Sequence, residues 1–579
     1  MSKLSCLLRM LFDSRAARKR PNPDRSREES EGDPAPTAVP QDPLLPPWRH
    51  LLDNDRSLWA DAMTQSRHGP RILIANSIPN FHISTNIESL LAVALTLRGA
   101  EVHILLCNRA LAACQNNKFE KNSPDTIADG TFHDLLCDTC MGRGSAFTDL
   151  GLTVHQYSQY LAESDRREIN ELVRLLPSAE IPGYRHQGLA VGEHAYAGCL
   201  RYYGTATLEG QARSDEVLRK YLEAALTTTK IMWRLTSRYS FLAACFHHGI
   251  YVPQGPIGEV CRAQDIRVAT WNRAYRNRCF MFSHKDTYHH TMLDEPVSTW
   301  KSMKFGPEDE QAVLDYLKTR WRGSQDWIPF HVSSDESAET LVRETGVNLK
   351  QPIVGMLTNV LWDAQILYSA NAFPTQLDWI KTTVAYFAHR PDLQLLIRVH
   401  PAEVRSLTAS RQFVIEEIQA DFPTLPANVF IIPPESNINT YAAMQHCNCA
   451  IIYGTKTGVE LTSMGIPVIV AGEAWIRNKG LTIDVASQKE YSEILDGLPL
   501  AESRLTEEQV REARKYAYHF FLRRMIPLAS ISPTPEKKIP FEVSIKSLKE
   551  LLPGVDDGLD LICDGILKGS PYNYHSEQA

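Results

Sequence analysis

Several polar residues in the second half of this sequence directly follow short apolar runs, and their types suit binding of a phosphorylated ligand. Arg398 and His400 end the run "LQLLIRVH", and a proline follows, so His400 is expected at a sheet rim beside a helix start. There its imidazole can donate a hydrogen bond to a phosphate oxygen, and Arg398 points to the same side of the strand. Glu435 and Ser436 follow "NVFIIP" in the same way, and Ser436 can cap the next helix. All four residues are therefore candidates for ligand contact.

A loop of small hydroxylated residues, Thr455, Lys456, Thr457 and Gly458, follows the apolar run "CAIIYG". A helix is expected to begin directly after it, so free backbone N–H groups and the helix dipole would favour an anion here. The two threonine hydroxyls add further donors. Glu460 lies in the first helical turn, where a carboxylate can accept two hydrogen bonds from a ribose. The loop therefore predicts a phosphate site and Glu460 a ribose contact; the alternative role for Glu460 is electrostatic support of the helix start.

The elements that would position these residues form an alternating series after residue 350. Five apolar runs predict short strands: "PIVGML", "LQLLIRV", "NVFIIP", "CAIIYG" and "PVIVAG". Helical stretches separate them near 375–388, 407–420, 437–446 and 457–464. This alternation is typical of a doubly wound parallel sheet, whose ligands bind beyond the carboxyl ends of the strands. The polar groups therefore converge on one crevice and predict a nucleotide site. No P-loop motif and no strand-linked G-x-G-x-x-G is present, which argues against P-loop hydrolysis and dinucleotide redox chemistry.

An earlier α/β series opens with "RILIANS", "NIESLLAVALTLRG" and "EVHILLC", which predict a strand, a helix and a strand. A long helix is expected over about 214–246, followed by strands at "GIYVP", "IRVATW" and "CFMFSH". We therefore predict an α/β protein with two Rossmann-like, doubly wound domains, at 70–335 and 350–530, that face a central cleft. Residues 1–47 predict a disordered basic, Pro-rich tether, and residues 531–579 a C-terminal tail.

Composition limits the classes of function. The chain has 579 residues, 43% of them hydrophobic, and a net charge of −7, so bulk nucleic-acid binding is not expected. No uninterrupted apolar run approaches the length of a membrane span. The first residues, "MSKLSCLLRMLF", are apolar and basic but are interrupted by Arg9, which is unlike a signal peptide. We expect a cytoplasmic protein, with weak peripheral association at the inner face of the cytoplasmic membrane as an alternative to a frayed terminus.

Twelve cysteines in a chain of this length do not form a disulfide scaffold and fit a reducing compartment. Cys137 and Cys140 form a C-x-x-C pair, and Cys107 and Cys114 precede it. Four thiolates could hold a structural zinc ion. The wide spacing from Cys107 to Cys114 favours inert buried thiols instead, and no other cofactor is expected.

Four stretches together resemble bacterial capsule and surface-polysaccharide biosynthesis glycosyltransferases of the Kdo-transferase type: "TNVLWDA", "FPTQLDWIKTTVAYFAHRPDLQLLIRVHPAEV", "NVFIIPPESNINTYAAM" and "YGTKTGVELTSMGIPVIVAG". The stretch "WIRNKGLTID" continues the match. The resemblance is good over about 350–530 and looser over 70–300. It implies the two-domain GT-B fold, with an activated-sugar donor in the C-terminal domain and the acceptor in the N-terminal one. His400 matches the family's His-Pro motif, implied to contact the donor phosphate. Thr455 and Thr457 match its phosphate loop, whereas Lys456 stands where a small residue is usual.

Glycosyl transfer needs a base for the acceptor hydroxyl, or a charge near the anomeric carbon. Glu193 lies among glycines and alanines in an expected loop, His248 precedes a predicted strand, and Asp286 follows one. Glu193 is the first candidate, and the other two follow. The run "FSHKDTYHH" also admits a metal reading through the side chains of His284, Asp286, His289 and His290. Such strand-end clusters more often bind substrate or cap a helix, so no metal ligand is predicted.

The sequence therefore predicts a GT-B, metal-independent glycosyltransferase that moves a sugar from a nucleotide-sugar donor to a glycan or glycolipid acceptor of a capsule-like polysaccharide. No D-x-D follows a predicted strand, which argues against a metal-dependent GT-A enzyme. Two alternatives stay open: a UDP-sugar 2-epimerase, and a non-catalytic nucleotide-binding subunit of an envelope assembly complex. The motifs do not choose among CMP, UDP and GDP donors, or between inversion and retention.

Overall fold

The computed structural model describes residues 42–322, 325–327, 334–364, 370–405, 409–534 and 540–574. Residues from 42 onward form one compact unit. Most of the predicted tether lies outside the described residues, but its last part is packed: Leu45 is buried, and Asp42 accepts a hydrogen bond from Arg143 at 2.8 Å. None of the helices in the described ranges is both long enough and apolar enough to cross a bilayer.

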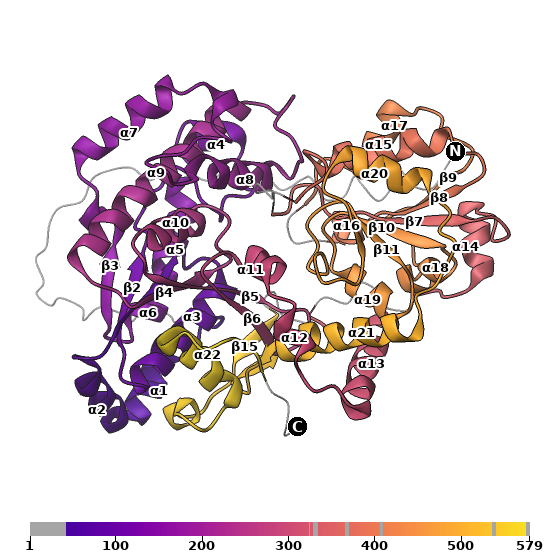
Figure 1. Cartoon of the computed structure of the whole chain (residues 1–579). Coiled ribbons are helices and arrows are strands. Elements are labelled where there is room, and N and C mark those ends of the chain that lie inside the picture. Colours follow the sequence, from indigo (N-terminus) through magenta and orange to yellow (C-terminus); the bar gives the residue numbers. More distant parts are fainter. Residues whose placement is uncertain are drawn as a thin grey trace, which may run out of the picture. The chain divides into compact units, whose positions relative to one another are not determined.

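The first sheet has seven strands in the order β13-β6-β5-β4-β1-β2-β3 (Figure 1). Strands β1 to β5 are parallel, whereas β6 and β13 run antiparallel to their neighbours. The strand bounds are β1 Arg71–Ser77, β2 Glu101–Leu106, β3 Thr153–Gln156, β4 Ala243–His247, β5 Arg267–Arg273, β6 Cys279–His284 and β13 Ile526–Pro527. The principal helices of this region are α3 His82–Leu97, α5 His133–Arg143, α7 Glu163–Leu175, α8 Val191–Tyr203, α9 Ser214–Arg238, α10 Gln254–Ala263, α11 Tyr288–Asp294 and α13 Pro307–Arg322.

The second sheet has six strands, all parallel, in the order β12-β11-β10-β7-β8-β9. Its strands are β7 Ile353–Leu357, β8 Gln394–Arg398, β9 Val429–Ile432, β10 Cys449–Ile452, β11 Val468–Val470 and β12 Ile483–Asp484. The helices between and after them are α14 Ala338–Thr345, α15 Gln376–Ala388, α16 Ala402–Arg405, α17 Val414–Asp421, α18 Thr440–Gln445, α19 Thr457–Ser463, α20 Gln488–Asp496 and α21 Glu507–Tyr518. The strand order reverses between β7 and β10, which makes their carboxyl ends the topological switch point of the sheet. The predicted doubly wound architecture is therefore confirmed.

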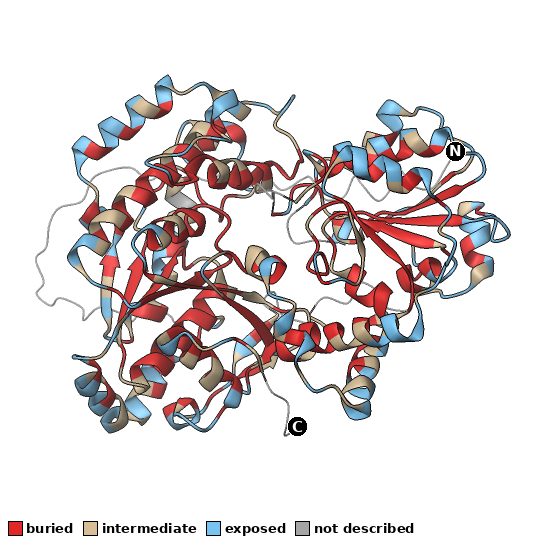
Figure 2. Ribbon diagram, viewed as in Figure 1, coloured by how far each residue is buried: buried red, intermediate tan, exposed pale blue. Residues whose placement is uncertain are grey.

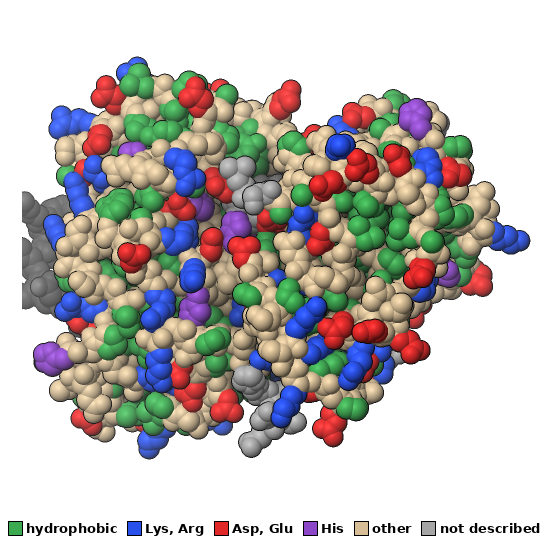
Figure 3. Space-filling view, in the orientation of Figure 1, with side chains coloured by type: hydrophobic (Ala, Val, Ile, Leu, Met, Phe, Trp, Pro, Cys, Tyr) green, Lys and Arg blue, Asp and Glu red, His purple; other side chains and the backbone are tan. Residues whose placement is uncertain are grey.

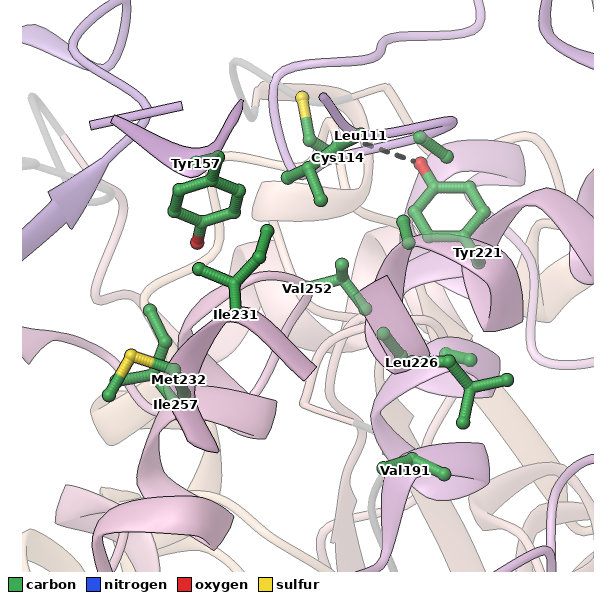
Figure 4. Packing of buried hydrophobic residues seen from close by; sticks show 14 of the residues in the cluster. Leu111, Cys114, Tyr157, Val191, Tyr221, Leu226, Ile231, Met232, Val252 and Ile257 are labelled. Carbon is green, nitrogen blue, oxygen red and sulfur yellow. Dashed lines mark hydrogen bonds between the residues drawn. The ribbon is translucent and has the colours of Figure 1, made fainter. Parts of the chain in front are cut away.

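Both sheets are covered on two faces, and alternate residues of each strand supply the two cores (Figure 2). In β1, Leu73 and Ala75 pack with α8, α9 and α10, whereas Ile72 and Ile74 pack with α3. Figure 4 shows the first of these clusters, where the Tyr221 hydroxyl of α9 donates to the backbone oxygen of Cys114 at 3.4 Å. Burial on both faces explains why the strands read as continuous apolar runs.

The last residues of the chain return to the first sheet. Strand β13 pairs with β6, and helix α22 (Asp557–Lys568) contributes Leu559 and Ile562 to the core beside α3. A short hairpin of β14 (Ile531–Pro533) and β15 (Phe541–Val543) adds Phe541 to the same core. The segment predicted as a tail is thus, in its described part, a packed component of the first α/β region.

Three predicted elements differ from the structure. The helix expected over 214–246 ends at Arg238, and the residues after it form the buried strand β4. The stretch "GIYVP" is a turn that leads into α10 rather than a strand. The loop expected around Glu193 is the first turn of helix α8.

On the face drawn in Figure 3, basic and acidic side chains of the described residues are interspersed.

Candidate functional site

A cavity of about 370 Å³ opens at the switch point of the second sheet. This volume lies within the range of ligand pockets, and parallel sheets bind ligands at this position. The residues after β7, β8 and β10 form much of its lining, and residues after β5 and on α13 are also part of it. Among the lining residues are Thr358, Asp363, Arg398, His400, Thr455 and Lys456. The structure therefore brings together the predicted residues that follow strands β8 and β10.

His400 lines the cavity directly after β8. Its Nδ1 accepts the backbone N–H of Ala402 at 3.0 Å. A nitrogen that accepts carries no proton in the neutral imidazole, so Nε2 carries it and can donate. The backbone N–H of His400 donates to the Thr358 hydroxyl at 3.2 Å, which ties the loops after β7 and β8 together. His400 therefore has the geometry of a hydrogen-bond donor to an anion.

Arg398 lines the cavity but is 2% exposed, and its guanidinium is held by the following loop. It donates to the backbone oxygens of Pro433 and Ser436 and to the Thr440 hydroxyl. Burial lowers the pKa of Arg398 to about 10, and the nearby Arg405 adds to this effect. The positive charge of Arg398 thus lies close to the cavity with carbonyl and hydroxyl partners.

The loop after β10 presents hydroxyls and one ammonium group to the cavity. The side chains of Thr455 and Thr457 are 3.1 Å apart at their hydroxyl oxygens, and Lys456 lies between them in sequence. Burial lowers the pKa of Lys456 to about 8, with the neighbouring Arg320 as the next cause. Helix α19, which follows the loop, has only seven residues. The ammonium group of Lys456 is the full positive charge that this loop supplies to the cavity.

Four of the predicted binding residues do not line the cavity: Glu435, Ser436, Gly458 and Glu460. Glu435 and Ser436 lie after β9, where Ser436 Oγ contacts Glu344 at 3.3 Å and the Glu435 backbone oxygen accepts from Arg405 at 3.4 Å. Gly458 lies inside α19, where an added Cβ would be 2.7 Å from Ile452 Cδ1, so this glycine permits close packing of the helix on β10.

Glu460 also lies behind the cavity wall, and it is 1% exposed. Its carboxylate accepts from Arg320 Nε, from the Tyr441 hydroxyl at 3.0 Å and from Lys456 Nζ at 3.3 Å. Burial alone would raise the pKa of Glu460, but Arg320 and Lys456 hold it below its usual value. The predicted ribose contact would have to replace these protein partners.

The three predicted bases lie outside the cavity lining. Glu193 is in the first turn of α8. His248 is buried with φ +66°, and its ring stacks on Tyr251 at 5.1 Å between centroids. Asp286 lies 3.5 Å from His290 Nδ1. The catalytic roles of these residues stay predictions, and His289, from the same run as Asp286, is the one that reaches the cavity.

Three carboxylates that were not among the predicted site residues line the cavity: Asp326, Asp363 and Glu473. Asp363 belongs to "TNVLWDA" after β7, and its Oδ1 accepts the Tyr251 hydroxyl at 2.9 Å. Glu473 follows β11, and burial raises its pKa to about 7. Arg273, at the end of β5, lines the opposite part of the cavity. Asp363 follows a strand as the selected residues do, so the strand-end rule could have found it.

Metal ligation finds no ready geometry in the described ranges, where no group of three or more His, Cys, Asp or Glu side chains is arranged to hold an ion. Cys137 and Cys140 lie on helix α5, and His133 Nδ1 is 3.3 Å from Cys137 Sγ. Burial raises the pKa of Cys107 to about 11 and that of Cys140 to about 12. The thiol form of these side chains is therefore favoured.

The chain resembles one protein family and several solved structures. Curated sequences give no match. Among solved structures, Thermosulfurimonas dismutans KpsC, a beta Kdo 2,7 transferase, is 12% identical with a TM-score of 0.31, over 56% of this chain and 88% of that chain. Its beta Kdo 2,4 transferase is 10% identical with a TM-score of 0.31, over 48% and 79%. The UDP-GlcNAc 2-epimerase from Neisseria meningitidis is 8% identical with a TM-score of 0.20, over 78% and 94%.

These identities and TM-scores are too low to support a fold assignment. The assignment rests instead on the strand orders of the two sheets. The sequence match is specific to one segment: residues 330–500 fit the model of a family described as Capsule polysaccharide biosynthesis protein. That segment contains β7 to β12 and the loops that hold His400 and Lys456. The part of the chain that forms most of the cavity therefore has the sequence pattern of the capsule polysaccharide biosynthesis family.

Proposed function

We propose that this protein is a glycosyltransferase that moves a sugar from a nucleotide-sugar donor to a surface-polysaccharide acceptor. The observation that carries the proposal is the convergence of His400, Lys456, Thr455 and Thr457 on one cavity at the switch point of the second sheet. The family match over residues 330–500 supports it. Lining by residues that follow β5 gives the cavity a second wall, where an acceptor can approach the donor.

In this proposal the second sheet holds the donor. His400 Nε2 and the two threonine hydroxyls donate to the donor phosphate, and Lys456 adds positive charge. Charge grows on the leaving phosphate as the glycosidic bond breaks, and donors that are already in place stabilise that charge. Asp363, which lines the cavity and is held by Tyr251, is the carboxylate that we assign to act on the acceptor hydroxyl or near the anomeric carbon.

The proposed acceptor is a glycan or glycolipid of the capsule type. The apolar, basic stretch at residues 1–20 supports a cytoplasmic protein that associates weakly with the inner face of the membrane. We test the enzymatic proposal in two steps. Thermal unfolding is first measured with CMP, UDP, GDP and their sugars, since a bound ligand raises stability by mass action.

The donor found in this way is then incubated with and without candidate acceptors. Transfer that depends on the acceptor supports the proposal. Isomerisation of a UDP-sugar without acceptor would identify a 2-epimerase. Saturable nucleotide binding without turnover of any donor would identify a non-catalytic subunit.

A further inference from the structure

A buried cluster of charged side chains lies under the loop that follows β10. Lys456 Nζ is 3.3 Å from Glu460 Oε2 and 3.5 Å from Glu460 Oε1. Arg320, on helix α13, forms ion pairs with both Glu460 and Asp326. Arg320 and Glu460 are 140 positions apart in the sequence, so α13 and the loop are joined through this carboxylate.

The cluster has an exposed side and a buried side. The Lys456 side chain is 15% exposed and lines the cavity, whereas the Glu460 side chain is 1% exposed and does not. Arg320, Asp326 and Tyr441 also line the cavity, and the Tyr441 hydroxyl donates to Glu460 Oε1 at 3.0 Å. The cavity therefore meets the ammonium group of Lys456, whereas the Glu460 carboxylate is behind it.

The surroundings of Lys456 would disfavour its charge without Glu460. Burial and the positive charge of Arg320 in the same cluster both disfavour the charged form of Lys456. The Tyr275 ring, whose centroid lies 4.6 Å from Lys456 Nζ, is a cation–π partner that offsets only part of this cost. A buried ammonium group keeps its charge only when an opposite charge lies close by. Glu460 lies 3.3 Å from Lys456 Nζ, whereas burial raises the pKa of Asp326 and so weakens its negative charge, which makes Glu460 the principal anion for Lys456.

We propose that Glu460 is a positioning residue: it keeps Lys456 charged and directed into the cavity, and Lys456 in turn binds a phosphate group of the ligand. This inference rests on the proposed nucleotide-sugar site and assigns a different role to Glu460 than contact with ribose. A carboxylate behind an ammonium group acts on the ligand only through that group. Removing either residue of the pair should therefore have the same consequence.

The test is calorimetric titration of the nucleotide that gives the strongest thermal shift, together with its 2′-deoxy and 3′-deoxy forms. The variants are Glu460→Gln, Lys456→Met and the double variant. Glu417→Gln is the matched control, because Glu417 pairs with Lys381 at 3.3 Å in the same region but does not line the cavity. Steady-state kinetics with the donor sugar accompany the titrations.

We expect each single variant to bind the nucleotide about 10- to 100-fold more weakly, the range for a lost hydrogen bond to a charged group. The double variant should lose no more than either single variant, because the two side chains act as one unit. The ratio of affinities for the ribose and deoxy forms should be the same in wild type and Glu460→Gln. The value of kcat should fall together with affinity, and the control should be unchanged.

Two results would overturn the inference while leaving the proposed function in place. One is a ribose-to-deoxy ratio that falls to one in Glu460→Gln, which would show direct contact with the sugar hydroxyl. The other is additive loss in the double variant. If Glu460→Gln does not fold, Lys456→Met carries the test, and wild-type affinity in that variant overturns the inference. Absence of nucleotide binding by the wild type would instead remove the proposed function, and this inference with it.

Discussion

The Tyr251 hydroxyl donates a hydrogen bond to Asp363 Oδ1 across 2.9 Å, and the same hydroxyl oxygen accepts the backbone N–H of Ala364 at 3.0 Å. Tyr251 follows β4 of the first sheet, and Asp363 follows β7 of the second. A single phenol therefore holds the loop of the other sheet at the cavity. Burial raises the pKa of Asp363, and the hydrogen bond from Tyr251 opposes that rise.

Replacing Tyr251 by phenylalanine should move the acid limb of the pH–rate profile to higher pH. The lost hydrogen bond stabilises the ionised carboxylate of Asp363, so its pKa rises further in the variant. If that carboxylate must be ionised, kcat/KM falls more at pH 6 than at pH 8. Tyr202→Phe is the control, since Tyr202 donates to the Asn122 backbone oxygen instead. An unchanged acid limb in Tyr251→Phe would argue against a catalytic role for Asp363.

His400→Ala should lower kcat by roughly 100-fold, the scale for the loss of one donor that stabilises developing charge. His400 lines the cavity, and its Nδ1 accepts a backbone N–H, so Nε2 is the donor whose effect grows as the leaving phosphate gains charge. Nucleotide affinity should change less than kcat. His446→Ala, an exposed histidine at the end of α18, serves as control. Equal turnover in His400→Ala and wild type would place the donor elsewhere.

Nucleotide affinity should decrease as the pH rises above about 8. Lys456 has a pKa lowered to about 8 by burial and by Arg320, so its charge is present below this pH and lost above it. The groups that face its ammonium are Glu460, Arg320, Asp326 and the ring of Tyr275. Titrations between pH 7 and 9.5 measure the effect, and Lys456→Met should show a flat profile. A decline of equal size in that variant would assign the titration to another group.

The contribution of His247 to the unfolding free energy should fall as the pH drops from 6.5 toward 4. Burial lowers the pKa of His247 to about 3, whereas an unfolded histidine titrates near 6.5. In this window the unfolded chain binds a proton that the folded state excludes, so folding loses about 2 kcal/mol by pH 5 from this residue. His289, with a pKa lowered to about 3, adds to the slope. Denaturant unfolding at pH 7 and pH 5 measures it.

The matched pair for this measurement is His247→Gln and His446→Gln. The first variant should have a smaller difference in unfolding free energy between the two pH values, by up to about 2 kcal/mol. The second replaces an exposed histidine and should keep the wild-type difference. The same loss in both variants would show that the buried ring is not responsible.

Deleting residues 1–41 should leave thermal unfolding and donor turnover unchanged, because the compact unit begins at residue 42. The cut must not extend further, since Leu45 and Trp48 belong to the core beside α3. If the basic residues contact anionic lipid, the deletion should reduce co-sedimentation with phosphatidylserine vesicles at low salt. A lower midpoint of thermal unfolding would show that the segment contributes to the fold.

Strands β7 to β11 of the second sheet could be predicted to within about two residues, because a strand buried on both faces is a continuous apolar run. The edge strand β12 could not, since it has only two residues and both are partly exposed. Strand β4 could not: "AACFH" has small side chains and directly follows the helical pattern of α9, so the two read as one helix. His400 and the loop after β10 were found because parallel strands place their carboxyl ends together. The partners of Glu460 were not found, because Arg320 is 140 positions away in the sequence. Hydrophobic periodicity contains no information on contacts between residues so far apart.

The return of β13 and α22 to the first sheet also has a consequence for synthesis of the protein. Domains fold from the N-terminus as the ribosome delivers them, at about 5–20 residues per second. Here the face of the first sheet beneath α3 is completed only by residues 526–572, which are translated after the entire second sheet. The apolar surface of β1, β4 and β5 on that face therefore stays incompletely covered for roughly 15–60 seconds of translation. During translation the second sheet can thus be finished before the first, and the nascent first region is the part that a holdase chaperone would recognise.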